Sequence, residues 1–112
     1  RGIDQCLTIY PMEHWQTLTT SLQKLSFTKS SVRKLRRFLI GSSTEMECDR
    51  QGRILIPAHL REYAGLKKEA LVIGTGATIE IWNPAVLDAA NGDDESIADL
   101  AESLDIPMDF DL

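Results

Sequence analysis

Cysteine and histidine are scarce in this sequence of 112 residues, which has two of each. Cys6 and Cys48 lie 42 residues apart with no C-x-x-C pair, and neither His14 nor His59 lies near them at a zinc-ligand spacing. The sequence therefore predicts no metal site and no disulfide. Both cysteines are expected to be reduced and partly buried.

The signatures of enzymes are also missing. There is no Ser–His–Asp order of the hydrolase kind and no glycine loop that could hold a phosphate. Glu47 and Asp49 are two residues apart, but we expect them at an exposed turn, where carboxyl groups lack the raised pKa of a general acid. The prediction is a protein that is not an enzyme and has no cofactor and no small-molecule substrate.

Long apolar runs are absent as well, and no segment has the pattern of a signal peptide, so we expect a soluble, cytoplasmic protein without a membrane partner. The length suits one domain with one core, and 43% apolar residues suffice to fill it. The first residue is Arg1 rather than Met, so the sequence is expected to be a part of something longer.

Basic residues are absent from the last 44 positions, and this absence is the most informative one. Residues 1–68 hold all twelve basic residues against six acidic ones, whereas residues 69–112 hold eleven acidic residues and no Lys or Arg. Such opposed halves are typical of a surface for a polyanion joined to an acidic tail. The net charge of -5 therefore does not exclude nucleic acid as a partner.

The rest of the sequence alternates between strand and helix patterns, which predicts an α+β fold. Apolar alternation or short apolar runs predict strands, and apolar residues every three or four positions predict helices. The expected strands are 6–11, 44–48, 53–56, 70–74 and 78–82, and the expected helices are 12–25, 29–40, 57–64 and 94–104. Gly41 and Gly65 are expected to end their helices in a left-handed conformation, and Pro57 suits a first turn.

A tight turn, "DRQG" at residues 49–52, is expected to join the strands 44–48 and 53–56 in a hairpin. Asp49 suits the first position of a type I turn, where its carboxylate accepts backbone N–H bonds, and Gly52 suits the position that needs positive φ. Both are therefore predicted to shape the turn. Arg50 and Arg53 would project from it, and a guanidinium can form two hydrogen bonds to a phosphate or to guanine.

The predicted helix at 29–40 has one basic face. Its members are Lys29, Arg33, Lys34, Arg36 and Arg37. Two interpretations stay open: a solvated or subunit-facing surface, or attraction to DNA phosphates with Arg33 and Arg37 as contacts.

An internal repeat is indicated at an offset of 72 residues. It aligns Leu7 with Ile79, Ile9 with Ile81 and Tyr10 with Trp82, each time in a strand followed by proline and a helix. A counterpart of the "DRQG" turn would then lie about 23 residues before Arg1.

The segments "RKLRRFLIGSSTEMECD", "DRQGRILIPAHLR" and "LVIG" with a following "IEIW" resemble the MraZ family of bacterial transcriptional regulators, over residues 1 to about 90. The resemblance implies two fused SpoVT-AbrB-like halves that form a small swapped-hairpin β-barrel with short flanking helices. The first half's turn motif would precede Arg1. The implied division is residues 1–28 as the rest of the first half, 29–44 as a basic linker helix, 45–90 as the second half and 91–112 as an acidic tail.

The resemblance also implies a function. We expect a sequence-specific, nucleoid-associated regulator that binds repeated promoter sites of the cell-division and cell-wall gene cluster as a ring-shaped homo-oligomer. Double-stranded DNA would contact the arginines of the turns. The alternative is an AbrB-fold antitoxin-like module whose acidic C-terminal segment binds a basic partner protein, with Ile97, Leu100 and Leu104 as its apolar contacts.

Overall fold

The structure is a computed structural model that describes residues 1–92 and 97–105. It is an α+β fold, as predicted. The strands are β1 (Leu7–Ile9), β2 (Leu71–Gly74) and β3 (Ile79–Trp82), and the helices are α1 (Met12–Gln23), α2 (Ser30–Leu39), α3 (Ala58–Ala64), α4 (Pro84–Ala90) and α5 (Ile97–Ser103). Within the described ranges, no helix has both the length and the hydropathy needed to cross a bilayer.

The three strands form one antiparallel sheet in the order β1-β3-β2. In the β1–β3 pair, Leu7 lies opposite Ile81, Ile9 opposite Ile79, and Thr8 opposite Glu80. Thr8 and Glu80 are also the residues that the 72-residue offset aligns with each other. A closed barrel is not confirmed, because the described residues form an open sheet with β1 and β2 at its edges.

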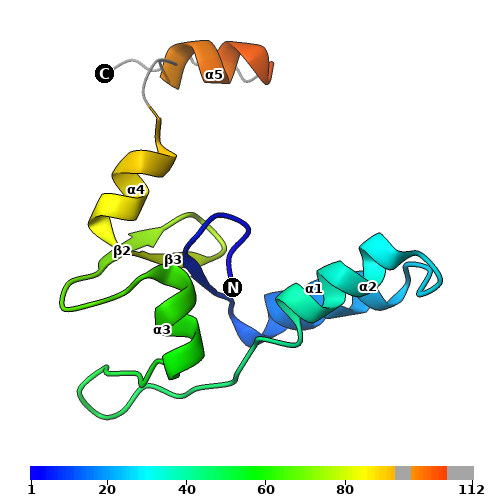
Figure 1. The fold of residues 1–112 in the computed structure, drawn as a ribbon, viewed down its shortest axis with the longest axis horizontal. Helices are drawn as coiled ribbons and strands as arrows, with labels where there is room; N and C mark the ends of the chain where they lie inside the picture. The colour runs from blue at the N-terminus through cyan, green and yellow to red at the C-terminus, as the bar shows by residue number, and fades with distance from the viewer. Residues whose placement is uncertain (93–96, 106–112) are drawn as a thin grey trace.

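The core lies where α3 crosses the sheet. Leu7 and Ile81 from the sheet are buried against Leu60 and Ala64 from the helix. Ile54, Ile56, Tyr63 and Leu66 pack around this cluster. Figure 1 shows α3 beside the sheet and the chain from α2 approaching it through a long irregular segment.

The end of α3 confirms the predicted cap. Gly65 has a φ of 66°, and its N–H donates to the carbonyl of Glu62. The N–H of Leu66 donates to the carbonyl of Arg61, and the Leu66 side chain packs on the core. Any residue with a side chain would be strained in this left-handed conformation, which explains the glycine. Pro57 lies at the N-cap, one position before the predicted first turn.

The hairpin strands predicted at 44–48 and 53–56 are wrong, because neither segment is extended into a ladder. The turn between them exists, but within the described chain a single backbone hydrogen bond, from Asp49 N–H to the Arg53 carbonyl, joins the two segments across it. A two-stranded hairpin is marginal by itself and needs further strands. Ile54 and Ile56 instead pack on the core, while Leu55 between them is 82% exposed.

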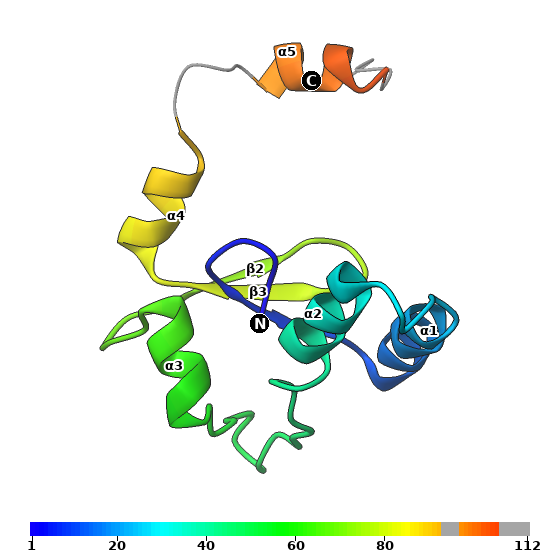
Figure 2. The same ribbon diagram turned by 45° about the vertical axis from the view of Figure 1, so that its right-hand side comes forward.

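Helices α1 and α2 form an arm, residues 12–40, that lies beside the sheet (Figures 1 and 2). The Arg36 guanidinium donates from Nη2 to the carbonyls of Leu22 (2.9 Å), Gln23 (3.2 Å) and Leu25 (2.9 Å). These carbonyls belong to the end of α1, where helical partners are lacking. Arg36 therefore fastens α1 to α2.

The prediction that Gly41 ends its helix in a left-handed conformation is wrong. Gly41 is not among the described residues with positive φ, although α2 ends at Leu39, two residues before it. A Cβ at this position would lie 2.6 Å from the Arg37 carbonyl oxygen. Glycine is needed here because the backbone approaches the last helical turn too closely for a side chain.

Candidate nucleic-acid interface

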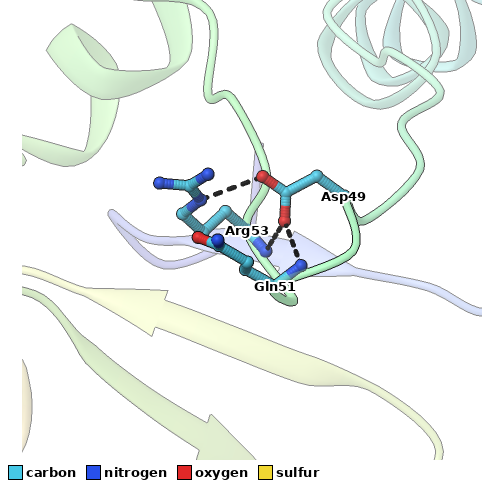
Figure 3. Close-up of polar contacts among 3 residues, drawn as sticks. All are labelled: Asp49, Gln51 and Arg53. Carbon is cyan, nitrogen blue, oxygen red and sulfur yellow. Dashed lines mark hydrogen bonds and ion pairs between the residues drawn. The ribbon is translucent and has the colours of Figure 1, made fainter.

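The turn at residues 49–53 is organised by the Asp49 carboxylate (Figure 3). Its Oδ1 accepts hydrogen bonds from the backbone N–H groups of Gln51 and Arg53, both at 2.8 Å. Its Oδ2 accepts one from Arg53 Nε at 2.9 Å. The backbone closes the turn with a bond from Gly52 N–H to the Asp49 carbonyl at 3.0 Å, and Gly52 has a φ of 77°. Asp49 and Gly52 lie where the sequence placed them.

These hydrogen bonds lower the pKa of the Asp49 carboxyl below its ordinary value of 3.8. The largest cause is the bond from the Arg53 backbone N–H, and the Arg53 side chain and Gln51 N–H act in the same direction. Hydrogen bonds to the charged form of an acid favour ionisation. Asp49 is therefore a carboxylate at neutral pH, and its charge holds Arg53.

Asp49 uses only one nitrogen of the Arg53 guanidinium. The bond is to Nε, and Figure 3 shows the two terminal nitrogens directed away from the carboxylate. The Arg53 side chain is 71% exposed. Arg50, at the tip of the same turn, is exposed and makes no hydrogen bond or ion pair within residues 1–92 and 97–105. The turn thus presents one oriented and one free guanidinium to solvent.

The basic face of α2 is used differently. Arg33 Nη1 donates to the carbonyls of Phe27 and Thr28, both at 2.9 Å, so its charge serves the loop between α1 and α2. Arg37 lies in a groove of about 460 Å³ between α2 and the N-terminus, lined by Arg1, Ser31, Lys34, Leu35, Arg37 and Phe38. Both views show the arm and the segment that carries the turn as separate features. The four candidate arginines are therefore not brought into one site.

Comparison with known proteins identifies the family. Residues 39–93 match the family described as "MraZ protein, putative antitoxin-like". Transcriptional regulator MraZ from Thermomicrobium roseum is 50% identical over 84 residues, and those from Desulfitobacterium hafniense (strain Y51) and Acetivibrio thermocellus are 43% identical over 105 residues and 42% over 110. The chain belongs to the MraZ family.

The matches cover 75%, 93% and 95% of this chain, and 59%, 73% and 77% of the three relatives, in the same order. The chain therefore spans less than two thirds of the T. roseum protein and about three quarters of the other two. The expected family is confirmed. The relatives' names describe regulators of transcription and not enzymes, in agreement with the expected absence of catalysis.

The structural roles of Arg33 and Arg36 in this MraZ family member were missed in the sequence. Arg36 was assigned only to a basic face and Arg33 was predicted as a DNA contact on that face. Arg36 donates to carbonyls at the end of α1, and Arg33 donates to the carbonyls of Phe27 and Thr28 in the loop before α2. The available signal was their spacing of three on a helix that follows another helix after a short loop, because cations are favoured near a helix C-terminus.

The cysteines differ from each other more than predicted. Cys6 is buried and Cys48 is exposed, and both are free thiols. Burial raises the pKa of the Cys6 thiol, and the charge of Glu80 adds to the effect. The described residues contain no group of three or more His, Cys, Asp or Glu that could hold a metal ion.

Proposed function

We propose that this protein is a transcriptional regulator that binds double-stranded DNA through the turn at residues 49–53. One observation carries the proposal: Asp49 holds Arg53 by Nε and leaves its terminal nitrogens exposed. The relatives are named transcriptional regulators, which agrees with a DNA-facing role. As such a regulator, the protein would act on the nucleoid in the cytoplasm.

The proposed mechanism depends on the preorganisation of Arg53. A planar guanidinium can form two parallel hydrogen bonds to the O6 and N7 of guanine, and such a pair discriminates between bases by about 1–3 kcal/mol. Because the Arg53 side chain is already oriented by Asp49, less conformational entropy is lost when it binds. Arg50 has no such partner among the residues that the structure describes and is better suited to a phosphate, where direction matters less.

One turn gives too little contact for tight binding. Repeated promoter sites met by several copies of the turn would raise the affinity without new chemistry. This is the physical reason for proposing a ring-shaped homo-oligomer as the active form. The operators would be repeated sites at the promoter of the cell-division and cell-wall gene cluster.

We also infer that the sheet is half of a barrel with two-fold pseudosymmetry. Thr8 and Glu80, aligned by the 72-residue offset, face each other across an antiparallel pair, as a two-fold axis between them requires. This axis relates Leu7 to Ile79 and Ile81 to Ile9. The first two are buried by α3, whereas Ile79 and Ile9 are 40% and 37% exposed. A second unit of a turn and a helix equivalent to α3 would cover them and complete the swapped-hairpin barrel.

Replacement of Arg53 by alanine tests the proposed function. Arg53→Ala is expected to weaken binding to promoter DNA by about five- to 150-fold, since a bidentate base contact of about 1–3 kcal/mol is lost. Arg53→Lys keeps the charge but not the fork and should remain close to the alanine variant on the operator. Mobility shift with operator and scrambled duplexes measures both effects.

Two further variants act as controls. Arg50→Ala should reduce affinity for both duplexes and make the dependence on salt shallower, as expected for a phosphate contact. Arg61→Ala removes an exposed arginine from α3 and should change little. Size-exclusion chromatography checks that each variant keeps its assembly. Operator binding by Arg53→Ala equal to that of the unaltered protein would refute the proposal.

A further inference from the structure

Gln51 lies in the turn, yet its side chain has no part in holding the turn together. Its backbone N–H donates to Asp49 Oδ1 at 2.8 Å, and Gln51 is exposed. Among the described residues, the Gln51 side-chain amide has no hydrogen-bond partner. An amide carries two N–H donors and a carbonyl acceptor, so these groups remain for water or a ligand.

The Asp49 carboxylate fixes the backbone of Gln51 in the same way as that of Arg53. Its Oδ1 accepts the N–H of both residues, each at 2.8 Å. Figure 3 shows the Gln51 and Arg53 side chains leaving the turn on the same side. Because one carboxylate fixes the backbone that carries both side chains, a molecule that meets the Arg53 guanidinium also meets the Gln51 amide.

The amide of Gln51 suits one base better than the other three. In the major groove, adenine presents the N6 amino donor next to the N7 acceptor, and a glutamine amide can bond to both. Guanine presents two acceptors there, whereas cytosine presents a single donor and thymine a single acceptor. An amide has no charge to offer a phosphate, so its value at a DNA-facing turn lies in the pairing of donor with acceptor.

We propose that Gln51 reads an adenine in the major groove beside the guanine that Arg53 reads. The inference rests on the proposed function of the turn and extends the readout from one base to two. Cα atoms two residues apart are separated by at most about 7 Å, and bases follow one another along a strand every 3.4 Å or so, about half that distance. The adenine is therefore expected within about two base pairs of the guanine.

Arg50 is a less suitable reader of the second base. The Asp49 carboxylate accepts the backbone N–H groups of Gln51 and Arg53, but within the described chain no bond from Arg50 to Asp49 is found. Arg50 therefore contributes charge without a fixed direction, and Gln51 contributes direction without charge. The two residues should differ in how their loss depends on the DNA sequence.

Gln51→Met tests the amide without disturbing the turn. Methionine keeps the length of the side chain, and the bond to Asp49 comes from the backbone N–H, which remains. The variant is expected to bind its preferred duplex about five- to 150-fold more weakly, as for the loss of one bidentate base contact. Affinity for a scrambled duplex should change less than about twofold. Gln16→Met, at an exposed position of α1, is the matched control and should change neither.

The preferred duplex is selected by the unaltered protein from a library of random sequences. Each purine of this duplex is then replaced in turn by its 7-deaza analogue, which has a C–H group in place of the N7 acceptor. One 7-deazaadenine is expected to weaken binding of the unaltered protein by about fivefold or more, but binding of Gln51→Met by less than about twofold. Equal losses in both proteins at every adenine would overturn the proposal.

Gln51→Glu tests the direction of the hydrogen bonds. Glutamate keeps the shape of the side chain but replaces the amide donor with a second acceptor, and a carboxylate accepts from the N4 amino group of cytosine. At the position of the adenine, the variant should therefore prefer cytosine. Competition between duplexes that differ only there measures the preference. A variant that still prefers adenine would contradict the proposal.

The two proposals fail in different ways. A guanine whose 7-deaza analogue weakens the unaltered protein but not Arg53→Ala, without any adenine that depends on Gln51, would overturn this inference alone. A library that yields no preferred sequence, or no guanine that depends on Arg53, would overturn the proposed function and this inference with it. Equal weakening of the preferred and scrambled duplexes by Gln51→Met would indicate a phosphate contact and would overturn the reading of a base.

Discussion

At the scale of the residue, arginines with the same chemistry have different roles because of what lies within reach. Arg36 and Arg33 are surrounded by carbonyl oxygens and donate to them. Arg53 reaches a carboxylate that engages only Nε, and the rest of its fork stays in solvent. A guanidinium has five N–H donors and no acceptor, so the nearby acceptors decide whether it is structural or available to a ligand.

Asp49 is the residue on which the orientation of Arg53 depends. Asp49→Asn removes the charge that holds Nε and is expected to weaken operator binding roughly two- to fivefold, the range of an exposed ion pair. This loss of affinity is smaller than that of Arg53→Ala because the Arg53 guanidinium itself remains. Mobility shift compares the two variants, and Glu47→Gln, two residues earlier in the chain, is the matched control. A loss as large as that of Arg53→Ala would contradict a purely orienting role.

The pH dependence of the turn follows from the same carboxylate. The folded pKa of Asp49 lies below its ordinary value of 3.8, so ionisation stabilises the turn above that pH. This contribution is lost as the pH falls through the folded pKa, in a window below about pH 4. Titration of the Asp49 carboxyl by NMR should give a midpoint below 3.8. A midpoint at or above that value would show that the hydrogen bonds are not formed in solution.

At the scale of the element, the two helices of the arm are joined by the side chain of Arg36. The buried side chains of α1 and α2 are Leu22 and Leu39. Arg36 also links the two helices, because it crosses from α2 to the three carbonyls at the end of α1. Polar contacts of this kind satisfy orphan carbonyls that water would otherwise have to reach.

Arg36→Met tests this link, because methionine keeps most of the stem but donates no hydrogen bond. The loss of bonds from a charged donor is expected to destabilise the arm by about 1–3 kcal/mol. Hydrogen exchange should show faster exchange of amides in α1, and urea unfolding should show the change in stability. Lys34→Met is the matched control on the same helix. Equal protection of α1 in both variants would contradict the link.

At the scale of the whole molecule, half of one sheet face is covered and half is open. Helix α3 covers Leu7 and Ile81, while Ile9 and Ile79 in the same two strands remain partly exposed. Apolar pairs in the middle of a sheet usually bury their side chains against a second layer. The proposed second unit of the barrel supplies that layer.

Ile79→Ala tests whether the open half is covered in the assembled protein. If it is, the substitution should cost about 2–4 kcal/mol, as for a buried isoleucine. Ile3→Ala is the matched control, because Ile3 lies outside the sheet and is 85% exposed. Denaturant unfolding of the oligomer measures both. A loss below about 0.5 kcal/mol for Ile79→Ala, as for surface positions, would contradict the barrel.

Much of the local structure could be predicted from the sequence. The Asp49 turn with Gly52, the cap at Gly65 and the strand around Ile79–Trp82 all depend on residues within a few positions of one another. The family was also predictable, because its motif lies in one continuous segment. The strands at 44–48 and 53–56 were not, because a strand needs partners that no local pattern reveals.

The sequence by itself determined the turn, the helices and the separation of charge, since these follow from backbone preferences and composition over short distances. Only the tertiary structure decided that Arg36 and Arg33 bind carbonyls, that Thr8 faces Glu80, and that Ile9 and Ile79 stay open. The physical reason is the same in each case. Contacts between residues far apart along the chain depend on how the elements pack, and that packing is not encoded in any single segment.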